Sequence, residues 1–142
     1  MSKTYKKVTG IGGVFFKCKD PDKMKDWYKN HLGLATDKYG ALFEFRNTDN
    51  PEQRGYLQWS PFKQETDYFE PSKKDFMINY RVENLENLLA GLAAQDIKIV
   101  GKMEKYDYGK FAWIVDPEGN KIELWEPVDE VFTEQYEGKT TH

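Results

Sequence analysis

Apolar and polar residues alternate over several short stretches of the chain, and this pattern predicts β-strands. The first stretch begins at Gly12 and ends near Lys19, and the last two are joined by a turn over residues 116–120 that contains Pro and Gly. The predicted strands cover residues 12–19, 41–46, 55–60, 76–82, 97–100, 111–115 and 121–125.

Two further segments carry apolar residues at the spacing of an amphipathic helix. Asp20 can cap the first helix, Pro21 suits its first position and Gly33 can end it. Asn84 can cap the second helix. The apolar stripes consist of Met24, Trp27, Tyr28, His31 and Leu32 in the first helix and of Leu85, Leu88, Leu89, Leu92 and Ala93 in the second.

The order of a strand, a helix and further strands therefore occurs twice, with two predicted strands after the first helix and three after the second. It predicts an α+β fold in which two tandem βαβββ modules form a curved mixed sheet, with the helices on one face and an inner cleft on the other. The whole chain is expected to be one domain. Its parts are a first module at 9–62, a linker at 63–75, a second module at 76–127 and a tail at 128–142 whose nearly helical apolar spacing suggests a short helix at a dimer contact.

The composition of the chain favours some kinds of site and partner and argues against others. Of the 142 residues 15% are aromatic, which favours an aromatic-rich core or pocket, and a net charge of −3 argues against nucleic acid as a partner. No apolar stretch reaches the roughly 20 residues that span a bilayer, so we expect a soluble, cytoplasmic protein without a membrane partner. A single cysteine, Cys18, excludes an internal disulfide scaffold and a multi-cysteine zinc site.

The segment D-P-E-G-N-K-I-E-L-W at residues 116–125 resembles a motif of the vicinal oxygen chelate superfamily, which includes glyoxalase I, bleomycin-resistance proteins and extradiol dioxygenases. The start of the first helix, Lys19-Asp20-Pro21, and its end at Gly33 resemble the same family. The resemblance covers about residues 9–127. It implies the glyoxalase/bleomycin-resistance/dihydroxybiphenyl dioxygenase-like fold.

Catalytic members of this family bind a divalent metal through four strand positions, two from each module. The resemblance places these positions at Gly13, at Gln58, near Met77 and at Glu123. Gly13 has no side-chain ligand atom, and the thioether of Met77 suits hard divalent ions poorly. Recruiting Asn79, one pleat from Met77, would still leave the site short of the about three protein ligands that a catalytic metal needs.

We therefore expect a degraded metal site, no resident cofactor and a cleft that binds a small, partly apolar or aromatic ligand, as the resemblance to the bleomycin-resistance branch implies. The alternative is a metal-dependent lyase or isomerase resembling glyoxalase I (lactoylglutathione lyase). There Gln58 and Glu123 would hold a divalent metal together with a ligand not identified in this chain or supplied by a partner subunit. A homodimer is expected, because members of the family often build their sites across a dimer.

Glu123 is the candidate base or ligand anchor, and the alternative is a solvent-facing glutamate. The candidate pocket residues are Phe15, Gln58, Met77, Asn79, Phe111, Trp113 and Trp125. Ordinary core packing is the alternative for the aromatic members. Two loops are expected to cover the cleft, one with Tyr68 and Phe69 in the linker and one with Tyr106 and Tyr108 before the seventh strand.

Overall fold

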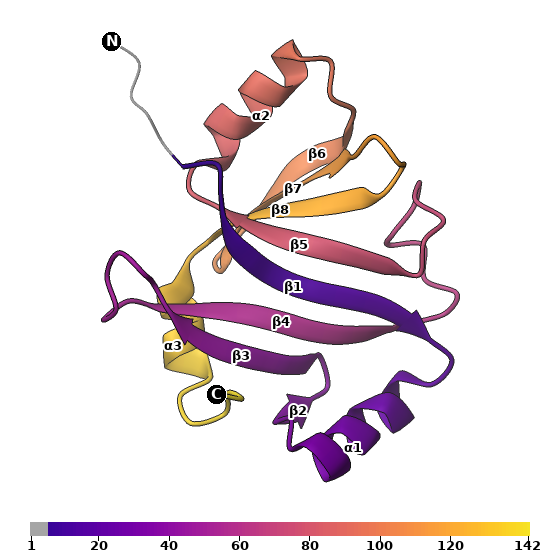
Figure 1. Cartoon of the computed structure of the whole chain (residues 1–142), viewed down its shortest axis with the longest axis vertical. Coiled ribbons are helices and arrows are strands. Elements are labelled where there is room, and N and C mark those ends of the chain that lie inside the picture. Colours follow the sequence, from indigo (N-terminus) through magenta and orange to yellow (C-terminus); the bar gives the residue numbers. More distant parts are fainter. Residues whose placement is uncertain (1–5) are drawn as a thin grey trace.

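The computed structural model describes residues 6–142, and it contains both predicted helices and all the predicted strands (Figure 1). Its elements are β1 (Val8–Cys18), α1 (Pro21–Leu32), β2 (Thr36–Asp37), β3 (Gly40–Arg46), β4 (Arg54–Lys63), β5 (Phe76–Val82), α2 (Leu85–Ala94), β6 (Ile99–Tyr106), β7 (Gly109–Val115), β8 (Lys121–Pro127) and α3 (Asp129–Gln135). The sequence pattern did not predict the short strand β2. Strand β6 also runs on to Tyr106, where the pattern predicts a loop.

The strands form one eight-stranded mixed sheet in the order β2-β3-β4-β1-β5-β8-β7-β6 (Figure 1). Within each module the first strand pairs in parallel with the last, β1 with β4 and β5 with β8. The modules join through the antiparallel pairing of β1 with β5, so they pair within one chain. The fold is therefore the α+β arrangement of two βαβββ modules that the element order predicts, with an unclosed sheet.

The local sequence explains where the two long helices begin and end. The Asp20 carboxylate accepts a hydrogen bond from the Lys23 backbone N–H at 3.1 Å, and the Asn84 side chain accepts one from Asn87 at 3.2 Å. At the end of α1, Gly33 has φ 74°, a left-handed conformation that glycine adopts without steric cost. The predicted caps and the predicted stop are confirmed.

The two helices pack to different depths. Helix α2 buries Leu85 and Leu88 in an aliphatic cluster with Val82, Ala112 and Leu124. Helix α1 has no buried residue and meets the sheet through aromatic contacts, with the Tyr28 and Trp59 rings 4.7 Å apart between centroids. The main aliphatic core therefore belongs to the second module.

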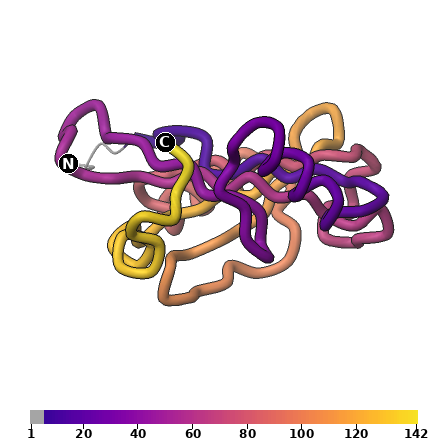
Figure 2. The backbone as a smooth tube through the Cα atoms, turned by 90° about the horizontal axis from the view of Figure 1, so that it is seen from below, coloured from indigo at the N-terminus to yellow at the C-terminus, as the bar shows by residue number. Residues whose placement is uncertain are grey.

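The other face of the sheet carries a cleft that residues of both modules and of α3 line. Figure 2 shows the β6–β7 segment (orange) and the C-terminal segment with α3 (yellow) projecting to the same side of the sheet. Strand twist accumulates across a sheet of this width, so its outer strands turn away from the plane of the central ones. The predicted short helix in the tail forms as α3, and Phe132 on this helix packs against Tyr56 of β4 with ring centroids 5.6 Å apart.

None of the helices within residues 6–142 combines the length and apolar character needed to cross a membrane.

Candidate ligand-binding site

One row of residues crosses the centre of the concave face. Strand register places Gln58 of β4 opposite Gly13 of β1, Gly13 opposite Asn79 of β5, and Asn79 opposite Glu123 of β8. The β5 residue of this row is therefore Asn79, one pleat along from Met77, near which the resemblance places the fifth-strand position.

A cleft of about 680 Å³ lies over this row, within the range of about 300–1,000 Å³ that is usual for ligand pockets. Seven of the candidate site residues line it: Phe15, Gln58, Asn79, Phe111, Trp113, Glu123 and Trp125. Met77 does not line it. Its side chain is fully buried among Phe15, Phe69 and Trp113.

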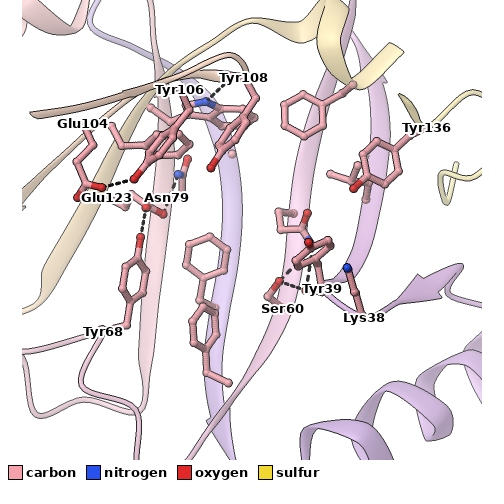
Figure 3. A pocket seen from close by; sticks show the side chains of 18 of the residues that line it. Lys38, Tyr39, Ser60, Tyr68, Asn79, Glu104, Tyr106, Tyr108, Glu123 and Tyr136 are labelled. Atoms are coloured by element: carbon pink, nitrogen blue, oxygen red, sulfur yellow. Dashed lines mark hydrogen bonds between the residues drawn. The ribbon is translucent and has the colours of Figure 1, made fainter. Parts of the chain in front are cut away.

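The Glu123 carboxylate lies on the floor of this cleft and is only 3% exposed (Figure 3). The Tyr68 hydroxyl donates to its Oε1 at 2.5 Å, and the Asn79 amide donates to its Oε2 at 3.0 Å. Burial raises the pKa of Glu123, and the donors of Tyr68, Asn79 and Trp113 partly counteract this rise. Glu123 is thus a positioned, desolvated carboxyl group, and the structure gives no support to the solvent-facing alternative.

Tyr68 brings the linker between the modules to this floor. The Lys121 ammonium donates to the Tyr68 carbonyl at 2.6 Å and lies 5.2 Å from the centre of the tyrosine ring. The neighbouring Phe69 is fully buried and anchors the segment. Burial, followed by the negative charge of Glu123, raises the pKa of Tyr68, so its hydroxyl remains protonated and able to donate.

The row does not fit a divalent metal. Both Glu123 oxygens already accept hydrogen bonds, and Gly13 supplies no side chain. Gln58 is turned toward the edge of the sheet, where its amide donates to Ser60 Oγ at 3.1 Å and to the Tyr39 carbonyl at 3.3 Å. Within residues 6–142 no three His, Cys, Asp or Glu side chains lie close enough together to hold a metal ion.

The absence of a side chain at Gly12 makes room for the Asn79 side chain at the floor. A Cβ atom at Gly12 would overlap Asn79 Oδ1 and would lie 2.9 Å from both Arg81 Cγ and the Trp125 ring. That Asn79 oxygen is buried and accepts no hydrogen bond from any residue that the structure describes. A buried acceptor without a partner is costly, so the floor has unused hydrogen-bonding capacity.

Aromatic rings form the walls of the cleft. Tyr106 and Tyr108 stack with centroids 5.1 Å apart and planes inclined by 2°, and Phe111 stacks on Trp125 at 5.7 Å. Tyr106 and Tyr108 come from the end of β6 and the β6–β7 turn, at the place where the sequence led us to expect a covering loop.

Several lining residues were missed by the sequence analysis. They are Lys38, Tyr39, Leu42, Ser60, Phe62, Glu104, Phe132, Gln135 and Tyr136, with Gly12 and Pro61. The nearly helical spacing of the tail was the one available signal for Phe132 and Tyr136, although it was interpreted as a dimer contact. Tyr39 lies in a polar turn, where its backbone N–H donates to the Asp37 carboxylate at 2.8 Å. Nothing in the sequence of such a turn indicates that Tyr39 lines a cleft.

A buried ion pair holds α3 at the end of the cleft. The two terminal nitrogens of Arg81 donate to the Asp129 carboxylate at 3.0 and 2.5 Å, and one of them also donates to the Tyr56 carbonyl at 3.1 Å. The guanidinium lies between the rings of Phe45 and Trp125, at 5.2 and 5.4 Å from their centres. This bidentate, stacked geometry fixes the helix that carries Phe132 into the cleft wall.

Comparison with known proteins gives a matching family profile and similar solved structures. The Glyoxalase/Bleomycin resistance protein/Dioxygenase superfamily profile matches residues 10–124. No curated protein matches the chain.

Solved structures share the fold. Methylmalonyl-CoA epimerase from Mycobacterium tuberculosis superposes with a TM-score of 0.58 and 22% identity, over 92% of this chain and 95% of the epimerase. A variant of methylmalonyl-CoA epimerase from Streptomyces coelicolor in complex with 2-nitronate-propionyl-CoA gives a TM-score of 0.62 at 12% identity, over 85% and 99%. The Mn(II)-bound glyoxalase from Novosphingobium aromaticivorans gives 0.55 at 20% identity, over 85% of this chain and 40% of that one. At these identities the similarity concerns the fold alone.

Proposed function

Because the chain belongs to the Glyoxalase/Bleomycin resistance protein/Dioxygenase superfamily, we propose that its cleft binds a small, partly aromatic or apolar molecule without a catalytic metal. The observation that carries the proposal is the central row, in which Gly13 replaces one ligand position and the Glu123 oxygens are occupied by Tyr68 and Asn79. The fold supplies a cleft of ligand size, while the row does not supply the ligands of a metal enzyme.

The walls and floor of the cleft have separate roles in this proposal. The rings of Tyr108 and Phe111, which meet edge to face, offer apolar surface to a bound ring, and burial of that surface supplies most of the affinity. Glu123 serves as a polar anchor on the floor, held in place by Tyr68 and Asn79. This division matches the general form of small-molecule sites, in which apolar walls surround a few positioned polar groups.

The metal-dependent lyase or isomerase has no observation in its favour. It would require Gln58 to turn back from Ser60 and a further ligand from a partner subunit. A homodimer remains a prediction, and its test by light scattering is independent of the ligand.

The test is calorimetric titration with naphthylmethanol, a neutral aromatic probe, in the presence of excess chelator. We expect one probe molecule per chain. Tyr108→Ala should weaken binding about tenfold, because it removes a stacking surface of the cleft. Trp27→Ala is the matched control, since Trp27 is an exposed aromatic residue of α1 outside the cleft, and its affinity should be unchanged.

Two results would contradict the proposal. One is the absence of binding by the unmodified protein, or equal weakening in both variants. The other is stoichiometric binding of Ni²⁺, Zn²⁺ or Mn²⁺ that Glu123→Ala abolishes, which would show that the row holds a metal after all.

A further inference from the structure

The charged side chains that line the cleft are mainly acidic. Glu123 lies on the floor, and Glu104 of β6 lies at the rim, where it accepts a hydrogen bond from the Tyr106 hydroxyl (Figure 3). Among the lining residues of the described chain, Lys38 is the only basic one. The ammonium of Lys121 is not among the lining groups; it donates to the Tyr68 carbonyl, and its charge lowers the pKa of Glu123.

Burial is the main cause that raises the pKa of two tyrosine hydroxyls in the lining, and nearby negative charges add to the rise. Burial raises the pKa of Tyr108, and the negative charges of Asp107, Glu123 and Glu104 raise it further. Burial likewise raises the pKa of Tyr136, with an added contribution from Asp37 across the cleft. Charges of one sign in a cleft with low-dielectric walls concentrate their field inside it, so a cation is attracted and an anion repelled.

The uncharged groups act in the same direction. The faces of aromatic rings carry partial negative charge, and Tyr106, Tyr108, Phe111 and Trp125 line one continuous stretch of wall. These ring faces complement a ligand that carries positive charge.

We propose that the cleft selects an organic cation, an ammonium group attached to an aromatic or apolar body. The body lies against Tyr108 and Phe111, and the ammonium is directed toward the floor, between Glu123 and the Glu104 rim. This inference rests on the proposed function and adds the ligand's charge to it.

The test compares three probes that share one ring system and differ in charge: naphthylmethylammonium, naphthylmethanol and naphthoate. Calorimetric titration at neutral pH and low salt should rank them cation, alcohol, anion, with the cation about tenfold tighter than the alcohol. Binding of the alcohol with an equal or weaker affinity for the cation would overturn this inference and leave the proposed function standing. Binding of none of the three would overturn the proposed function itself.

Two rim variants separate charge from shape. Glu104→Gln keeps the size of the side chain and should weaken the cation about threefold and the alcohol by less, and Lys38→Gln should strengthen the cation by a similar factor. Glu118→Gln, in the exposed turn before β8, is the matched control and should change neither affinity. Equal effects of Glu104→Gln on cation and alcohol would contradict the role of charge.

Discussion

The two βαβββ modules have the same strand topology but bury their helices differently. In the second module, Leu85 and Leu88 of α2 are 0% and 5% exposed. In the first, Trp27 and Leu32 of α1 remain 52% and 60% exposed, although the sequence gives both helices an equally regular apolar stripe. Equal periodicity therefore does not imply equal burial.

The difference follows from side-chain shape. The aliphatic side chains of α2 interdigitate with Val82 and Leu124 of the sheet. The stripe of α1 is aromatic, and its Tyr28 meets the broad ring of Trp59, which in turn lies 5.4 Å from Phe16. These ring contacts leave α1 without a buried residue, so less of its surface is removed from water.

A matching asymmetry exists on the concave face. The second module supplies the polar floor, Asn79 and Glu123, whereas the first supplies Gly13 and a Gln58 that is turned toward Ser60. The second module thus carries the aliphatic core, the polar floor and the stacked aromatic wall of the site, and the first contributes space together with the rings of Phe15, Tyr39 and Phe62.

The largest expected effect tests the difference between the helices. Leu85→Ala should lower the free energy of unfolding by about 3 kcal/mol, because it leaves a cavity in a fully buried cluster. Trp27→Ala removes a larger side chain but should cost less than about 1 kcal/mol, since half of that side chain is already exposed. Urea denaturation followed by circular dichroism measures both. Equal losses would show that α1 contributes as much to stability as α2.

The next effect concerns the space that the first module leaves in β1. Gly12→Ala should destabilise by about 2 kcal/mol, because its Cβ would overlap Asn79 Oδ1 and press against the Trp125 ring. Gly10→Ala is the matched control in the same strand, since nothing lies within 4 Å of its Cβ position, and it should be neutral or slightly stabilising. The same denaturation experiment applies. A tolerated Gly12→Ala would show that the floor can rearrange.

Local signals predicted most of the fold. Asp20, Gly33 and Asn84 act through neighbours within a few residues, so their caps and stop could be identified without tertiary information. The repeated order of strand and helix likewise led to the correct α+β class. By contrast, the pattern predicted only the first part of β6. The outer half of this strand, up to Tyr106, is exposed and polar, and an exposed edge strand lacks the alternation that marks a half-buried one.

The site was harder to predict because it depends on register. Alternation along β5 assigns Met77 and Asn79 to the same face and cannot say which is level with Glu123. The tertiary pairing of β5 with β8 decides this, and nothing in the residue pattern of β5 fixes its register against a strand more than forty residues away. Tyr39 and Tyr136 reach the cleft only through the curvature of the sheet and the packing of α3.

The smallest expected effect concerns the buried carboxyl group of the second module. Burial raises the pKa of Glu123 above its value in the unfolded chain, so between these two values the folded state binds more protons. Its contribution to stability is therefore fully present below the unfolded pKa and is lost as pH rises through the folded pKa.

Glu123→Gln keeps the shape without the titration, so it should gain stability relative to the unmodified protein as pH rises from about 4 to about 8. The gain is limited, because the hydrogen bonds from Tyr68 and Asn79 stabilise the ionised form of Glu123 and counteract part of the rise in its pKa. Urea denaturation at a series of pH values measures this difference, with Glu118→Gln as the exposed control. A difference between Glu123→Gln and the unmodified protein that does not change with pH would mean that the second module does not desolvate this carboxyl group, and the asymmetry between the modules would then be one of packing alone.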